Sequence, residues 1–169
     1  ADYTGAIRLA PRDPLYYNNR GNSYIGKDDY AQALADYDQA IKLYPKFALA
    51  YYNRGTAYRE HGEADRALAD FDMSIKLDPN YGNAYGNRAR IYRDRGDRAR
   101  ALADFARSLQ LSPDNDLDYY ARANMYFDDH DYPRALEDYD RAIKANASYA
   151  GVFNARCMTR AILGQLQEA

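Results

Sequence analysis

A period of 34 residues runs through the chain and constrains its fold more than any other feature. Small residues recur at this step, at Gly21, Gly55, Ala89, Ala123 and Cys157. Prolines recur at the same step, at Pro11, Pro45, Pro79 and Pro113. Self-similarity at a fixed period of this size is typical of repeat architectures, in which each unit buries its apolar face against its neighbours.

Each period contains two stretches with helical spacing of apolar and small residues. In the first repeat these residues are Tyr17, Gly21 and Tyr24, followed by Ala33, Tyr37 and Ala40. Steps of three and four residues place each group on one helix face. Glycines mark the turn between the two halves, at Gly62, Gly96 and Gly164, and a proline ends the second half. The pattern predicts helices near 2–10, 15–26, 31–43, 49–61, 64–77, 83–95, 98–111, 117–129, 132–145 and 150–163.

The repeated strings include YNNRGNSY and YYNRGTAY, each followed by a second string such as ALADYDQAIKLYP or ALADFDMSIKLDP. These strings resemble the tetratricopeptide repeat family, as a bacterial-type array with Asn-Arg-Gly motifs in the first helix. The resemblance implies an all-α fold, a right-handed superhelical solenoid of antiparallel helix pairs. It covers 1–169 as a single solenoid, with full repeats 14–47, 48–81, 82–115 and 116–149 and partial repeats 1–13 and 150–169. The partial repeats predict that the chain is part of a longer array.

Two charged residues recur with the repeat. Position 7 of the repeat holds Arg20, Arg54, Arg88, Arg122 and Arg156. Position 23 holds Asp2, Asp36, Asp70, Asp104 and Asp138. An arginine at a mostly inward position needs an anionic partner, because an unpaired buried charge is costly. We therefore predict a ladder of Arg–Asp pairs within a repeat or between neighbours. A role for the arginines in binding a ligand stays open as the alternative.

Asparagine recurs on the face of the first helices that is concave in this family. Position 6 holds Asn19, Asn53 and Asn87. Since an asparagine side chain both donates and accepts hydrogen bonds, such a column suits an extended peptide backbone. The alternative is that these residues only solvate a polar groove or cap neighbouring groups. The predicted peptide-binding residues are Asn19, Asn22, Tyr52, Asn53, Arg59, Asn87, Arg90, Arg93, Tyr120 and Asn124.

An arginine-rich stretch lies at 88–107, and Arg90 and Arg93 of this stretch fall on groove positions, as does Arg59 one repeat earlier. Arginine pairs well with carboxylates, so these side chains predict a preference for an acidic residue of the partner. The alternative is that these arginines are solvated by water and form ion pairs within their own helix. The terminal-carboxylate clamp of chaperone-binding relatives is not predicted, because its asparagines have counterparts here and its basic residues do not.

Composition argues against several classes of function. A net charge of −2 argues against nucleic-acid binding, and no apolar stretch is long enough for membrane insertion. A single cysteine excludes an internal disulfide, and we expect Cys157 to pack in the small-residue position of its repeat. His61 and His130 lack ligand spacing, and no catalytic motif is visible, so we expect no metal, no cofactor and no enzyme activity. A cytoplasmic location fits this composition.

The sequence therefore predicts a protein–protein interaction scaffold that holds an extended peptide or partner segment in a concave groove. One alternative is a structural, self-assembling spacer, and another is a regulatory docking arm of an enzyme outside this chain. Weak head-to-tail self-association is also predicted from apolar residues near the two ends. These are Tyr3, Ala6, Ile7 and Leu9 at one end and Ile162, Leu163 and Leu166 at the other.

Overall fold

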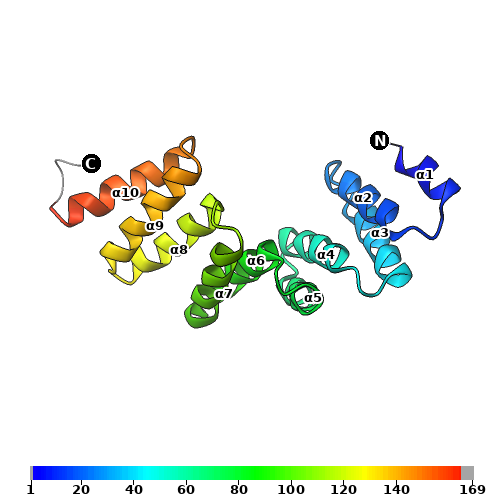
Figure 1. Ribbon diagram of the computed structural model, residues 1–169, viewed down its shortest axis with the longest axis horizontal. Helices are drawn as coiled ribbons and strands as arrows, with labels where there is room; N and C mark the ends of the chain where they lie inside the picture. Colours follow the sequence, from blue (N-terminus) through cyan, green and yellow to red (C-terminus); the bar gives the residue numbers. More distant parts are fainter. Residues whose placement is uncertain (1, 165–169) are drawn as a thin grey trace. The chain divides into compact units, whose positions relative to one another are not determined.

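The structure, a computed structural model, describes residues 2–164, which form ten helices and no strand (Figure 1). The helices are α1 (Tyr3–Leu9), α2 (Pro14–Ile25), α3 (Tyr30–Leu43), α4 (Ala48–Glu60), α5 (Ala64–Leu77), α6 (Gly82–Asp94), α7 (Arg98–Leu111), α8 (Asp116–Asp128), α9 (Tyr132–Ala145) and α10 (Ala150–Ile162). Every predicted helix is present, with ends within one residue of those expected. The all-α prediction is confirmed.

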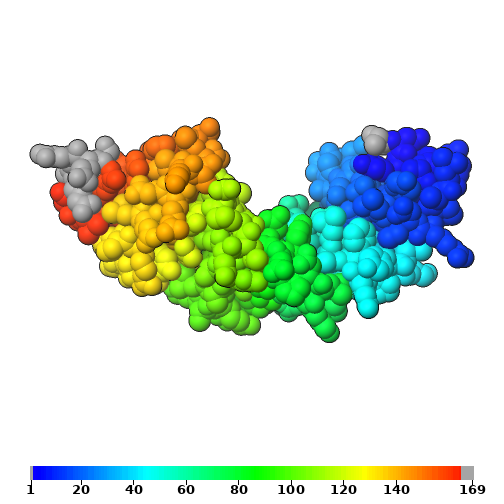
Figure 2. Space-filling model, in the orientation of Figure 1, coloured from blue at the N-terminus to red at the C-terminus, as the bar shows by residue number. Residues whose placement is uncertain are grey.

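The helices belong to two compact units, unit 1 (Ala1–Ile91) and unit 2 (Tyr92–Ala169). In unit 1, α2 packs on α3 and α4 packs on α5, and α3 also contacts α4. In unit 2, α8 packs on α9, which also contacts α10. Side chains of α8, α9 and α10 form a continuous surface, yellow to red in Figure 2. Pairs of neighbouring helices are thus the packing unit in both parts.

Small residues allow the two helices of a pair to approach closely. A Cβ atom added at Gly21 would lie 2.6 Å from Cε1 of Tyr37, which leaves no room for any side chain. At Gly55 the added Cβ would lie 3.0 Å from the ring of Phe71. Both rings are almost fully buried. The sequence pattern of a small residue facing a large aromatic residue therefore defines the core of these pairs.

The turn between the two helices of a pair has the same backbone conformation in every repeat. Position 15 of the repeat has positive φ at Asp28 (59°), Gly62 (77°), Gly96 (75°), His130 (62°) and Gly164 (74°). Glycine adopts this left-handed conformation without steric cost. The predicted role of Gly62 and Gly96 is confirmed, and two repeats adopt the same turn with a different residue. Gly164 has the same conformation after α10, and the second half of its repeat lies outside the described residues.

Aspartate begins several of the second helices. The Asp131 carboxylate accepts a hydrogen bond from the Arg134 backbone N–H at 3.2 Å, and Asp97 makes the equivalent bond to Arg100. These bonds satisfy backbone donors that a helix leaves free at its first turn. None of the helices in the described range is both long and apolar enough to cross a membrane.

Candidate functional site

The predicted Arg–Asp ladder is present in three repeats. Its bidentate pairs are Arg20–Asp36, Arg54–Asp70 and Arg122–Asp138, with nitrogen–oxygen distances of 2.7–2.8 Å. The aspartate side chains are only 4–7% exposed. Each pair joins the first and second helices of a single repeat, so the prediction is confirmed at these positions.

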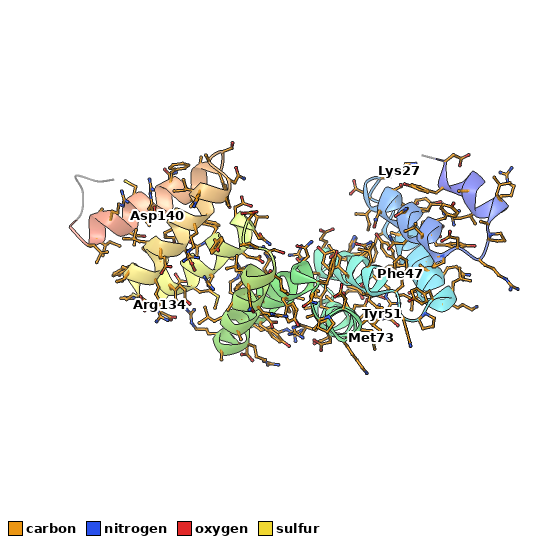
Figure 3. All side chains as sticks on the ribbon, in the orientation of Figure 1. Lys27, Phe47, Tyr51, Met73, Arg134 and Asp140 are labelled. Atoms are coloured by element: carbon orange, nitrogen blue, oxygen red, sulfur yellow. The ribbon has the colours of Figure 1, made fainter. Side chains whose placement is uncertain are left out.

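A second row of aspartates, which sequence reasoning missed, joins neighbouring repeats. The Arg54 guanidinium also donates to Asp38 of the preceding repeat at 2.6 Å. Arg88 and Arg156 make the same contact, to Asp72 at 2.6 Å and to Asp140 at 2.8 Å; Asp140 is labelled in Figure 3. The signal was available as Asp-x-Asp in the second helix, with aspartate at both position 23 and position 25.

The environment of Arg54 shows how firmly the position-7 arginines are held by neighbouring side chains. Burial alone would lower the pKa of Arg54, but its hydrogen bonds to Asp70 and Asp38 raise the pKa above the usual arginine value. The guanidinium also lies 5.6 Å from the ring centroid of Tyr51 and 5.9 Å from that of Tyr58. These contacts assign Arg54 to the scaffold rather than to a ligand.

The position-6 asparagines make hydrogen bonds between repeats. Asn53 donates from Nδ2 to Asn18 Oδ1 at 2.9 Å. Asn87 donates from Nδ2 to the Tyr52 hydroxyl at 3.1 Å, and also to a backbone carbonyl of its own helix. Asn19 accepts from Asn18 at 3.3 Å. Both Asn53 and Asn87 therefore commit their amide nitrogen to the scaffold, while no side-chain bond to their Oδ1 occurs within residues 2–164.

The position-9 asparagines have a different role. The Tyr37 hydroxyl donates to Asn22 Oδ1 at 2.7 Å, and the Tyr139 hydroxyl donates to Asn124 Oδ1 at 2.7 Å. Both tyrosines are 1% exposed, so their hydroxyl groups need a partner inside the protein. Burial, and then the charges of neighbouring groups, raise the pKa of both tyrosines above the usual value.

This pairing follows the sequence from repeat to repeat. Where position 24 holds phenylalanine, position 9 does not hold asparagine: the two such pairs are Phe71 with Thr56 and Phe105 with Arg90. A phenylalanine ring has no hydroxyl group to satisfy, so no acceptor is required. Asn22 and Asn124 are thus explained first by the scaffold, and their Nδ2 groups have no partner among the described residues.

Each unit has a pocket at these asparagines. In unit 1, a pocket of about 230 Å³ lies among α2, α3 and α4, lined by Asn22, Ile25, Tyr37, Asn53, Thr56 and Glu60. In unit 2, a pocket of about 220 Å³ lies among α8, α9 and α10, lined by Tyr120, Asn124, Phe127, Asp128, Tyr139 and Met158. Both pockets are lined by positions 9, 12 and 24 of one repeat and by positions 6 and 9 of the next. Position 13 comes from the later repeat in unit 1, as Glu60, and from the earlier repeat in unit 2, as Asp128. The two pockets bring together the predicted residues Asn22 with Asn53 and Tyr120 with Asn124.

The predicted residues outside these pockets contact neighbouring side chains. Arg59 lies 3.8 Å from the carboxylate of Glu60, and Arg93 donates to Asp94 at 2.8 Å. The Tyr52 ring packs edge-on against Tyr81, with 4.9 Å between the ring centroids. Asn19, Asn87 and Arg90 are half-buried on their helices.

Some pocket residues were not predicted. Those at positions 9, 12 and 13 are Ile25, Thr56, Glu60, Phe127, Asp128 and Met158. Taking positions 9, 12 and 13 in every repeat, instead of selecting asparagine, arginine and tyrosine, would have found these residues.

The expectation for Cys157 was wrong, because its side chain is exposed. In the earlier repeats the second helix covers this position, and no described helix follows α10.

Comparisons with known proteins agree with this geometry. Two family models, both described as tetratricopeptide repeat, match residues 18–82 and 82–115. A search of curated proteins finds no match to the chain.

Solved structures with the same fold include YrrB, with 20% identity and a TM-score of 0.78 over 98% of this chain and 85% of that one. A structure of MamA has 18% identity and a TM-score of 0.79 over 94% and 86%. MamA 41-end from Desulfovibrio magneticus RS-1 has 17% identity and a TM-score of 0.78 over 92% and 88%. At these identities the likeness concerns the fold alone. With the family models and the helix pairs in agreement, the chain belongs to the tetratricopeptide repeat family.

Proposed function

We propose that this chain, read as one repeat array over 1–169, is a protein-interaction scaffold that binds an extended segment of a partner protein. The observation that carries the proposal is the recurrence of one kind of pocket, at the same repeat positions, in both units. A solved relative in fold, YrrB, is described as a TPR protein with an unusual peptide-binding site, which supports the same use here. No catalytic role is proposed.

The asparagine side-chain atoms that make no hydrogen bond within the scaffold suit a peptide backbone. Asn22 and Asn124 each commit Oδ1 to a tyrosine hydroxyl, so the amide nitrogen is left to donate to a peptide carbonyl. Asn53 and Asn87 commit the amide nitrogen, so Oδ1 is left to accept from a peptide N–H. Asn19 also belongs to the proposed set. The two kinds of asparagine together offer both functions that an extended strand requires.

An acidic residue in the partner is a smaller part of the proposal. Arg59, Arg90 and Arg93 lie on the first helices of two neighbouring repeats. A partner carboxylate would have to compete with Glu60 and Asp94 for two of these side chains. We therefore expect the acidic preference to be weak and to decrease further with added salt.

A random peptide library displayed on phage tests the proposal with the purified chain as bait. Thr56→Trp would fill the pocket of unit 1, and Ala35→Trp would add the same bulk at an exposed position of α3. Circular dichroism verifies that both variants keep their helices. We expect peptides captured through unit 1 to lose binding to Thr56→Trp and to keep binding to Ala35→Trp. A library that yields no binder, or binders indifferent to pocket filling in either unit, would contradict the proposal.

Self-association is a second candidate, favoured by exposed apolar side chains on α1 and α10. Leu9, Met158, Ile162 and Leu163 are all exposed. Tyr3, Ala6 and Ile7 are half-buried on α1, and Leu166 lies outside the described residues. Such contacts would be head-to-tail and would not need to close into a ring. Sedimentation at increasing concentration tests this: a rising mass supports it, and a constant monomer mass contradicts it.

A further inference from the structure

The pocket of unit 2 contains a carboxylate but no cation. Asp128 contributes the carboxylate from the end of α8, and neither arginine nor lysine lines the pocket. Within residues 2–164 the Asp128 side chain makes no ion pair and no hydrogen bond. Most other acidic groups of this unit are paired; Asp129, the next residue, contacts Arg98. The pocket therefore carries an uncompensated negative charge.

Aromatic rings and a thioether form the remaining walls. Tyr120 and Tyr139 lie with their ring centroids 6.1 Å apart and their planes at 45°. Phe127 and Met158 contribute from α8 and α10, and Met158 is 57% exposed. Aromatic faces attract cations through their quadrupole, and the apolar walls suit an aliphatic stem. An unpaired carboxylate beside aromatic rings is chemistry that recognises a positively charged side chain.

The exposed Asp128 side chain and the buried Tyr139 side chain line the same pocket. The Tyr139 hydroxyl is held by Asn124 Oδ1. Burial, then Tyr120, then the negative charge of Asp128 raise the pKa of Tyr139 above the usual tyrosine value. The amide nitrogen of Asn124 is left to donate to the backbone or to the end group of a ligand.

The corresponding pocket of unit 1 differs in the environment of its carboxylate and in two of the residues that form its walls. Its acidic residue is Glu60, and the Arg59 guanidinium lies 3.8 Å from that carboxylate. Ile25 stands where unit 2 has Phe127, and Thr56 stands where unit 2 has Met158. Unit 1 thus supplies a comparison pocket in which the carboxylate comes from the later helix, α4, has a neighbouring cation and lies among fewer aromatic rings.

We propose that the pocket among α8, α9 and α10 binds the side chain of a lysine or arginine in the partner segment, with Asp128 as its counter-ion. The aliphatic stem packs against Tyr120 and Phe127, and Met158 closes the outer side. The proposal rests on the proposed function, since it names one residue class of the segment that the scaffold holds. Charge complementarity sets the occupant.

Methyl NMR spectroscopy on the whole chain tests this inference directly. The chain has three methionines, and Met158 lines the pocket, whereas Met125 is buried and Met73 lies in unit 1. The probes are N-acetyl-lysine amide and N-acetyl-arginine amide, with N-acetyl-norleucine amide as the neutral analogue. We expect a saturable shift of the Met158 methyl signal with the cationic probes, at millimolar concentration, and none at Met73.

Two charge-neutralising variants test whether the Asp128 carboxylate is the counter-ion of the cationic probes. Asp128→Asn should weaken the cationic probes about fivefold to tenfold, because it removes the counter-ion and leaves the aromatic walls. Glu60→Gln, which removes the carboxylate that lines the pocket of unit 1, should leave the titration unchanged. Equal binding of the neutral analogue, no saturable shift at Met158, or unchanged affinity in Asp128→Asn would each overturn the inference.

The peptide library separates this inference from the proposed function. If captured peptides carry lysine or arginine and lose binding to Asp128→Asn, both stand. If peptides bind through the pocket of unit 2 without a basic residue, the proposed function stands and the inference is wrong. If the cationic probes bind but no peptide does, the pocket binds cations and the proposed function is wrong.

Discussion

Tyr37 donates its hydroxyl proton to Asn22 Oδ1 across 2.7 Å, and this bond joins the two helices of one repeat at the edge of a pocket. The tyrosine is 1% exposed, whereas the asparagine is exposed to solvent. The partners therefore differ in what they lose when the bond is removed. Asn22 can bond to water, but the hydroxyl group cannot.

This asymmetry predicts the effect of each substitution. Asn22→Ala leaves a buried hydroxyl group without a partner and should cost about 1–3 kcal/mol of unfolding free energy. Tyr37→Phe should cost about 1 kcal/mol or less, because Asn22 then turns to water. The double variant should be more stable than Asn22→Ala alone. Urea denaturation measures all three, and simple additivity of the two losses would contradict the account.

Loss of a ladder carboxylate should be more damaging than loss of a surface carboxylate. Asp70→Asn breaks a bidentate pair in which the aspartate side chain is 6% exposed, so we expect a loss of about 3 kcal/mol. Glu137→Gln removes an exposed pair with Arg141 and should cost about 0.5 kcal/mol or less. Thermal and urea unfolding of both variants measure the contrast. Similar losses would show that the ladder does not act as a buried pair.

The second row of aspartates has a gap that can be filled. Arg122 pairs with Asp138, and the residue that corresponds to Asp38 in the preceding repeat is the exposed Ala106. Ala106→Asp should therefore place a second carboxylate beside Arg122 and stabilise the contact of α7 with α8 by about 0.2–1 kcal/mol. The gain should shrink at high salt. Ala103→Asp, at an exposed position on the same helix, is the control; an equal gain there would exclude a specific pair.

The left-handed turn predicts opposite effects of two substitutions. Gly62 has φ of 77°, and an added Cβ would meet nothing within 4 Å, so Gly62→Ala should cost about 1–2 kcal/mol through the backbone alone. Asp28 has φ of 59° at the same repeat position, so Asp28→Gly should relieve part of that cost. Unfolding free energies of the two variants should change in opposite directions. A stabilising Gly62→Ala substitution would refute the explanation.

Acid pH should weaken the start of α9. The side-chain hydrogen bond from Arg134, followed by the backbone bond, lowers the pKa of Asp131 below its ordinary value. A lowered pKa contributes stability that is complete above the ordinary aspartate value of about 3.9 and is lost as pH falls through the lowered value. Asp131→Asn keeps a capping side chain that does not titrate. The stability advantage of the wild type over this variant should therefore shrink on acidification, as measured by urea unfolding at several pH values; a pH-independent difference would exclude the mechanism.

The recurring residues made much of the fold predictable. A small residue such as Gly21 and an aromatic residue such as Tyr37 recur at one period, and this spacing suffices to locate helices to within one residue. The pairing of Arg54 with Asp70 was also predictable, because an inward arginine requires a carboxylate and both recur once per repeat. Such features depend on local spacing and on the need of a buried charge for a counter-ion, and both can be recognised from the sequence.

The candidate site was less predictable, because its contacts join helices of different repeats. Asn53 looked like a free groove residue, yet its amide nitrogen is committed to Asn18 of the preceding repeat. Asp128 is not among the residues predicted to bind a peptide, yet it lies beside aromatic rings from two helices and makes no ion pair with the described residues. Whether a polar group is committed to the scaffold or left for a partner depends on distances between repeats.

The sequence by itself determined the period, the helix ends, the turns and the residue types of the core, since these follow from spacing, steric limits and burial of apolar groups. Only the tertiary structure decided which asparagine atoms bond within the scaffold, and which carboxylate remains without a cation. The physical reason is that a hydrogen bond or ion pair forms only within about 3–4 Å. That distance is set by how one helix pair packs on the next, rather than by the order of residues in either.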